Sequence, residues 1–92
     1  MEIKQQALAG TLESSDVLVE MIPEACPLEI ELSSPVKAQF GEEILNTVRE
    51  VMADQGIDQG RIRLEDRGAL DCTIRARLLA CLERAQGQGG NQ

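Results

Sequence analysis

Residues 28–35 read Leu-Glu-Ile-Glu-Leu-Ser-Ser-Pro, and this stretch decides the fold class. Leu28, Ile30 and Leu32 alternate with polar residues, and a period of two is typical of a β-strand with one face in solvent. Ser34 and Pro35 then predict the start of a helix, because serine can cap a helix and proline is tolerated at its first position. The chain therefore passes from a strand directly into a helix.

The residues after Ser34 predict an amphipathic helix over residues 35–54. Six side chains lie within about 120° of one another when successive residues are placed 100° apart, as on a helix. They are Val36, Phe40, Ile44, Thr47, Val48 and Val51. Gly56 is placed to cap the C-terminus, because glycine adopts the left-handed conformation that ends many helices. We expect the apolar face of this helix to cover a core.

A second strand and a second helix follow. Ile62 and Leu64 alternate with charged residues, which predicts a strand over residues 61–65. A helix over residues 68–85, opened by Asp66 or a neighbour, then presents one apolar face. That face consists of Leu70, Ile74, Leu78, Cys81 and Ala85. Asp71 and Arg75 are four residues apart and are expected to form a weak ion pair on the helix surface.

The N-terminal third predicts a hairpin. Two strand-like runs, residues 7–12 and 17–22, flank Glu13-Ser14-Ser15-Asp16, so the tip is expected near Ser14 and Ser15. Pro23 and Pro27 are expected to bracket a loop that contains Cys26.

The resulting element order is β-β-β-α-β-α, which predicts an α+β fold. We expect a small four-stranded sheet, antiparallel or mixed, with two amphipathic helices packed on one face. Residues 1–85 are expected to form a single domain. Residues 86–92 contain no apolar side chain and predict a disordered polar tail.

The composition argues against catalysis by this chain alone. Its 92 residues include no histidine, tryptophan or tyrosine and one phenylalanine. Without histidine there can be no Ser-His-Asp or Cys-His nucleophile, no imidazole acid–base catalyst and no histidine-containing metal site. No glycine-rich phosphate loop is visible, and adjacent carboxylates such as Glu42 and Glu43 are ordinary in an acidic chain. We therefore expect a noncatalytic protein without a metal.

Charge is distributed unevenly along the chain, whose net charge is −7. Residues 1–46 hold nine acids and two lysines, whereas residues 47–92 hold seven acids and seven arginines. This balance disfavours nucleic acid as a partner, and the acidic first half suits docking to a basic protein surface. No apolar stretch approaches the roughly 20 residues that span a membrane, and the N-terminus lacks the apolar run of a signal peptide. A cytoplasmic protein without a membrane partner is expected.

Three cysteines, Cys26, Cys72 and Cys81, cannot form a complete disulfide framework. Cys72 and Cys81 would lie roughly 13 Å apart along one helix, too far for a bridge. We expect three free thiols, with Cys81 on the core face of its helix and Cys72 on the opposite side. The arginines at positions 67, 75 and 77 are expected to pair with acids, although a contact with phosphate stays open.

Three segments of the chain resemble the citrate lyase acyl carrier protein family, the gamma subunits of bacterial citrate lyases. Residues 9–16, Ala-Gly-Thr-Leu-Glu-Ser-Ser-Asp, resemble the family's N-terminal motif. Residues 39–41, Gln-Phe-Gly, resemble its middle segment. Residues 68–78, Gly-Ala-Leu-Asp-Cys-Thr-Ile-Arg-Ala-Arg-Leu, resemble its C-terminal signature. The blocks occur in the family's order and span most of the chain.

This resemblance implies a carrier with a covalently attached 2′-(5″-phosphoribosyl)-3′-dephospho-coenzyme A. The motif puts the attachment, a phosphodiester, on Ser14. The arm's thiol would carry acetyl and citryl thioesters between an alpha subunit (acyltransferase) and a beta subunit (lyase), as citrate is cleaved to acetate and oxaloacetate. A prosthetic-group transferase would be a further partner. Family members often have glycine after the attachment serine, whereas this chain has Ser15.

Two alternatives stay open. The chain could be the carrier of malonate decarboxylase or citramalate lyase, because substrate choice lies in the partner subunits. It could also be a noncatalytic acidic interaction module in which Ser14 is an ordinary turn serine.

Overall fold

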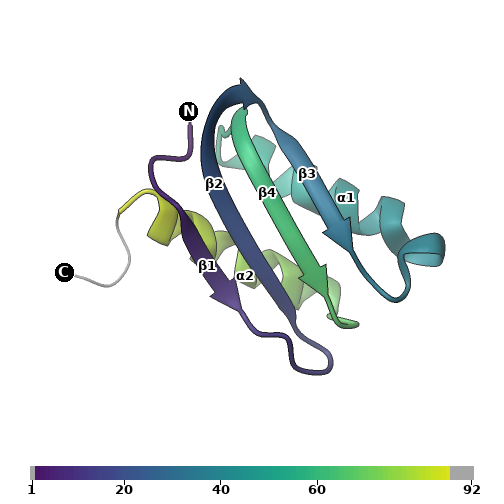
Figure 1. Ribbon diagram of the computed structural model, residues 1–92. Helices are drawn as coiled ribbons and strands as arrows, with labels where there is room; N and C mark the ends of the chain where they lie inside the picture. Colours follow the sequence, from purple (N-terminus) through teal and green to yellow (C-terminus); the bar gives the residue numbers. More distant parts are fainter. Residues whose placement is uncertain (1, 88–92) are drawn as a thin grey trace.

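The computed structural model describes residues 2–87, in which four strands and two helices form two layers (Figure 1). In chain order the elements are β1 (Ala7–Gly10), β2 (Val17–Pro27), β3 (Glu29–Ser33), α1 (Lys37–Asp54), β4 (Gln59–Asp66) and α2 (Asp71–Ala85). This order, β-β-β-α-β-α, confirms the predicted α+β fold. Helix α2 ends at Ala85, the last residue of the predicted domain. The tail prediction is wrong for Gln86 and Gly87, whose N–H groups donate to the carbonyl oxygens of Leu82 (2.9 Å) and Arg84 (3.0 Å), and its remainder, from position 88 onward, lies outside the described residues.

The sheet is mixed, with strand order β1-β2-β4-β3. Antiparallel pairing joins β1 to β2 and β2 to β4, whereas β3 runs parallel to β4. Both helices lie on the same face of this sheet (Figure 1). The turn between β1 and β2 and the end of β4 share one end of the molecule, and the bend from β2 into β3 lies at the other.

The core fills the space between the sheet and the two helices. Alternate residues of the central strands point into it, as the period of two predicts. The fully buried large side chains among the described residues are Val17, Val19, Met21, Val48, Met52, Ile62 and Leu78, together with Cys81 and Asp66. The opposite face of the sheet is open to solvent and carries charged residues from β2, β3 and β4.

The predicted loop around Cys26 is wrong. Strand β2 continues through Pro23 and ends at Pro27. Its pairing with β4 shifts register between Ile22 and Pro27, so the intervening residues have no Cα partner in the ladder. A proline costs little where its missing N–H is not needed for pairing, and the strand can therefore bend over the end of the sheet without stopping.

The expected helix starts are also displaced. Helix α1 begins at Lys37, and the Ser34 hydroxyl instead accepts a hydrogen bond from the Val36 N–H (3.1 Å) and donates to Asp66 Oδ2 (2.8 Å). Asp66 does not open α2. It is the buried last residue of β4, and its Oδ1 accepts from the Ala69 N–H across the turn at Gly68, where φ is +87°.

Two large side chains expected in the core are exposed. Phe40, in the first turn of α1, has 47% of its surface in solvent. Leu70 precedes α2 and is 70% exposed. Both lie at the N-terminal end of a helix, Phe40 in α1 and Leu70 just before α2. At those positions a side chain on the apolar face of its helix has no opposing strand to pack against.

Candidate functional site

The segment between β1 and β2 forms a tight turn with Ser14 and Ser15 at its centre. The Asp16 N–H donates to the Glu13 carbonyl oxygen (3.1 Å), which closes a four-residue turn. Both serines are exposed. The hairpin tip is therefore where the sequence predicted it.

The turn is held to the connection between β4 and α2 by two backbone hydrogen bonds. The Ser15 N–H donates to the Arg67 carbonyl oxygen (2.8 Å), and the Arg67 N–H donates to the Asp16 carbonyl oxygen (2.9 Å). These bonds continue the pairing of β2 with β4 beyond the last strand residues. The tip is thus fixed on its backbone although its side chains are in solvent.

Asp16 fixes the same turn through its side chain, which is only 13% exposed. Arg77 on α2 binds it with two N–H groups, Nε to Oδ1 (3.0 Å) and Nη2 to Oδ2 (2.8 Å). The Thr11 hydroxyl donates to Oδ2 (2.6 Å) and the Val17 N–H to Oδ1 (2.7 Å). The hydrogen bonds from Arg77, followed by the one from Thr11, hold the pKa of Asp16 well below its usual range.

Gly10 permits a close approach at the base of the turn. Its φ is +95°, and an added Cβ would lie 1.8 Å from the Val17 carbonyl oxygen. No side chain can be accommodated at that distance. A residue other than glycine would force apart the two strands that present the serines.

The two serines differ in backbone conformation. Ser15 has φ +66°, the left-handed region that favours glycine, which explains physically why a glycine suits the position after Ser14. Within residues 2–87 the Ser14 hydroxyl has no hydrogen-bond partner. An exposed oxygen of this kind, on a fixed backbone, can be reached by a modifying enzyme.

A protein-family model described as ACP, Malonate decarboxylase delta subunit (MdcD), matches residues 4–85. The citrate lyase acyl carrier protein of Lactococcus lactis is 52% identical over 85 residues, covering 92% of this chain and 88% of that protein. Its Klebsiella pneumoniae counterpart is 49% identical over 89 residues, covering 96% of this chain and 92% of that protein. The chain belongs to this acyl carrier protein family.

One solved structure is also similar to this chain. It is a chain of a Pseudomonas malonate decarboxylase hetero-tetramer in complex with malonate. The TM-score is 0.67 at 23% identity, with 90% of this chain and 86% of the other covered. At that identity the likeness shows the shared fold.

The three arginines of uncertain role all pair with carboxylates in this carrier. Arg67 Nη2 lies 3.7 Å from Glu65, and Arg75 binds both Asp71 (2.7 Å) and Glu50. The predicted pair between Asp71 and Arg75 is confirmed. The pairing of Arg77 with Asp16 was not predicted. Asp16 and Arg77 are 61 residues apart in the sequence, so no local sequence pattern predicts their contact.

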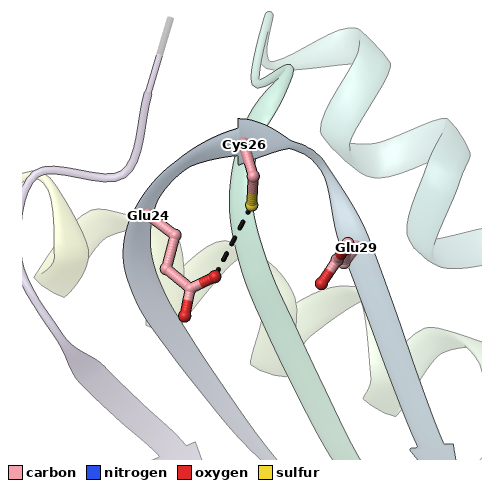
Figure 2. A group of neighbouring side chains, drawn as sticks. All are labelled: Glu24, Cys26 and Glu29. Atoms are coloured by element: carbon pink, nitrogen blue, oxygen red, sulfur yellow. Dashed lines mark hydrogen bonds between the residues drawn. The ribbon is translucent and has the colours of Figure 1, made fainter.

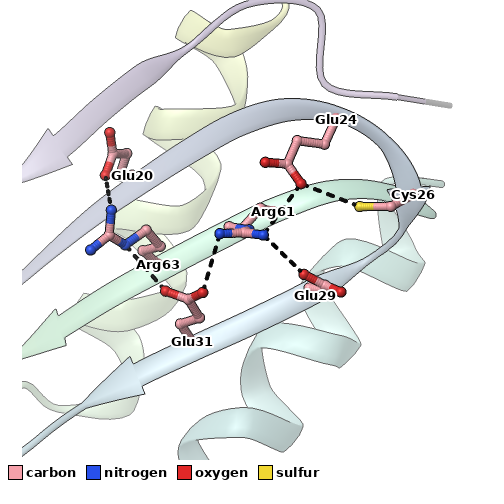
Figure 3. A network of polar contacts seen from close by, with 7 residues as sticks. All are labelled: Glu20, Glu24, Cys26, Glu29, Glu31, Arg61 and Arg63. Atoms are coloured by element: carbon pink, nitrogen blue, oxygen red, sulfur yellow. Dashed lines mark hydrogen bonds and ion pairs between the residues drawn. The ribbon is translucent and has the colours of Figure 1, made fainter.

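A group of potential metal ligands lies at the far end of the sheet from Ser14. Ligand atoms of Glu24, Cys26 and Glu29 lie within 4.8 Å of one another (Figure 2). The positive charge beside them is the guanidinium of Arg61, whose Nη2 lies 3.5 Å from Glu24 and 3.4 Å from Glu29 (Figure 3). Burial, followed by the hydrogen bond to Glu24, raises the pKa of the Cys26 thiol, and a protonated thiol is a poor metal ligand.

The same network covers the open face of the sheet. Arg61 also meets Glu31 (3.4 Å), and Arg63 meets Glu31 (3.3 Å) and Glu20 (3.6 Å) (Figure 3). Exposed pairs of this kind contribute little stability each. The seven residues drawn include four carboxylates and two guanidiniums, so the network has a net charge of −2.

All three cysteines are free, as predicted. Cys81 is buried on the core side of α2, and Cys72 is exposed. Over the described part of the chain, neither helix has the length and apolar character needed to cross a lipid bilayer.

Proposed function

We propose that this chain is the acyl carrier subunit of citrate lyase, with the Ser14 side-chain oxygen as its attachment point. The group attached would be 2′-(5″-phosphoribosyl)-3′-dephospho-coenzyme A, through a phosphodiester. The observation that carries the proposal is the exposed Ser14 hydroxyl, without a partner in residues 2–87, on a turn that Asp16 and Arg67 hold in place.

The residues of this chain fit such a group. The Ser14 oxygen engages no described residue, so forming an ester breaks no contact of the fold. When bound, the group supplies a thiol that can hold an acyl group as a thioester. The chain's own part is to hold the attachment point and to present surfaces to its partners. We infer a noncatalytic carrier over residues 1–85.

The partners would be the alpha (acyltransferase) and beta (lyase) subunits of citrate lyase and a prosthetic-group transferase. The acidic open face of the sheet suits docking to basic surfaces on those subunits. Identities of 49–52% to citrate lyase carriers, against 23% to the malonate decarboxylase chain, favour citrate over malonate as the substrate system. Compactness and the absence of a membrane-crossing helix in residues 2–87 agree with a cytoplasmic location.

The test is to co-produce Ser14→Ala with the modifying enzymes, measure the intact mass and map any adduct to a peptide. We expect a folded chain without an adduct. Replacing an exposed turn hydroxyl should change the free energy of unfolding by no more than about 0.5 kcal/mol, so lost loading cannot reflect unfolding.

Ser15→Gly is the matched control. Glycine suits the left-handed backbone at position 15, so this variant removes the second hydroxyl without disturbing the turn. It should be loaded like the wild type. An adduct that persists in Ser14→Ala and disappears in Ser15→Gly would contradict the assignment.

A further inference from the structure

An apolar groove opens between the start of α1 and the start of α2. Its volume is about 400 Å³, within the usual range for small-molecule sites. Phe40 and Ile44 of α1 form one side, and Leu70 and Ile74 form the other. Phe40 and Leu70 are two of the most exposed large apolar side chains in residues 2–87.

The groove begins beside the turn that presents Ser14. The Ser15 N–H binds the Arg67 carbonyl, and Gly68 and Ala69, the next two residues, line the groove. Consecutive Cα atoms are about 3.8 Å apart, so Ala69 lies within roughly 8 Å of Arg67. Figure 1 shows the turn, the end of β4 and the start of α2 at the same end of the molecule.

The charge of the groove restricts what can enter it. Glu43, Asp66 and Asp71 line it, and none of its described lining residues is basic. Asp71 is paired with Arg75 behind the groove, and the buried Asp66 already accepts from Ser34 and the Ala69 N–H, which leaves Glu43 as its open carboxylate. Phosphates would be repelled from these carboxylates. An uncharged chain that carries N–H donors and apolar groups would be accepted.

We propose that this groove binds the pantetheine portion of the arm attached at Ser14. Pantetheine is uncharged, has amide N–H groups that can donate to the Glu43 carboxylate, and has a pair of methyl groups that fit against Phe40 and Leu70. The phosphoribosyl and adenosine diphosphate units, which separate pantetheine from Ser14, stay outside, so the arm folds back to bring its far end into the groove. An acyl group that itself bears carboxylates is disfavoured in the groove, whereas an uncharged one is accepted.

This inference rests on the proposed attachment at Ser14, and two measurements keep them separable. The first compares methyl NMR spectra of the loaded and unloaded chain. We expect shifts at Ile44 and Ile74, which line the groove, and no shift at Leu8 on β1. If the adduct maps to Ser14 and only resonances of the turn move, the arm is free in solution and the groove proposal fails while the attachment stands.

The second measurement adds free pantetheine to the unloaded chain, which tests the groove even if no adduct forms at Ser14. The same two isoleucines should shift in a saturable way. Phe40→Ala should weaken this binding roughly five-fold, since it removes the aromatic side of the groove.

Leu79→Ala is the matched control, because Leu79 is 46% exposed against 47% for Phe40 and lies outside the groove. It should leave the binding of pantetheine unchanged. Absence of any shift with free pantetheine, or equal weakening by both variants, would overturn the proposal. Shifts at Ile44 and Ile74 that depend on protein concentration alone would instead assign the groove to contact between two copies of the chain.

Discussion

Replacing Gly10 by alanine should destabilise the chain far more than the same change at Gly68. Both glycines have positive φ, +95° and +87°, which costs an alanine about 1–2 kcal/mol. A smaller entropy of the unfolded chain offsets roughly 0.4–1 kcal/mol of that cost. An added Cβ at Gly68 meets nothing within 4 Å, so Gly68→Ala should cost about 1 kcal/mol in total.

At Gly10 the added Cβ would lie 1.8 Å from the Val17 carbonyl oxygen, whereas real contacts are not closer than 3.0 Å. The strands must therefore separate by at least the difference, 1.2 Å. Losing one or two hydrogen bonds between β1 and β2 adds about 1 kcal/mol each. Gly10→Ala should thus cost about 3 kcal/mol, a large part of the 5–15 kcal/mol typical of a domain.

Urea unfolding followed by far-UV circular dichroism measures both variants, since the chain has no tryptophan or tyrosine for fluorescence. With a slope of about 1 kcal/mol per molar, the midpoint should fall by roughly 3 M for Gly10→Ala and 1 M for Gly68→Ala. Equal midpoints for the two variants would refute the close approach described at the base of the turn.

Two further predictions concern ionisation and thiols. Because its partners lower the pKa of Asp16 in the folded state, that carboxylate stabilises the fold above its ordinary unfolded pKa of about 3.9, and the contribution is lost as the pH falls below about 4. The stability difference between wild type and Asp16→Asn, measured by urea unfolding, should therefore shrink as the pH is lowered from 6 towards 2; a constant difference would contradict this account. In the native chain Cys72 should react rapidly with a disulfide reagent, whereas Cys81 should not, since burial raises its pKa to about 11. Cys81→Ala should cost about 1 kcal/mol and Cys72→Ala less, so an equal loss in unfolding experiments would show that the two sites are not distinguished by burial.

The strands and helices that could be predicted are those whose signal is local. The alternation of apolar and polar residues around Ile30 and Ile62 indicates a strand with one buried face, and it can be recognised without knowing which strands pair with it. The same holds for the apolar faces of the two helices and for the polar tip at Ser14. Local signals end the second strand before Pro23, because a proline inside a central strand is tolerated only where the ladder is interrupted, and the interruption here depends on the pairing with β4.

The parts of the site that could not be predicted depend on contacts between distant residues. Asp16 and Arg77 meet because α2 packs across β1 and β2, and neither residue is unusual in its own surroundings. Phe40 shares the helical phase of Ile44, which predicts that it is buried. The helical phase does not show whether another strand or helix covers that end of α1, and Phe40 is exposed. The groove is a consequence of this missing cover, so only the assembled fold could reveal it.

The clamp of Asp16 by Arg77 has a mechanical consequence for a carrier. A turn bonded to a helix and to a neighbouring strand connection cannot act as a hinge, so the pivot of any attached arm is stationary in the frame of the protein. While the arm is outside the groove, the volume that its tip can sweep is set by the rotatable bonds of the arm alone. Reaching two active sites farther apart than that volume requires the whole body to reorient between its partners, and the surfaces that dock it therefore determine which site is served.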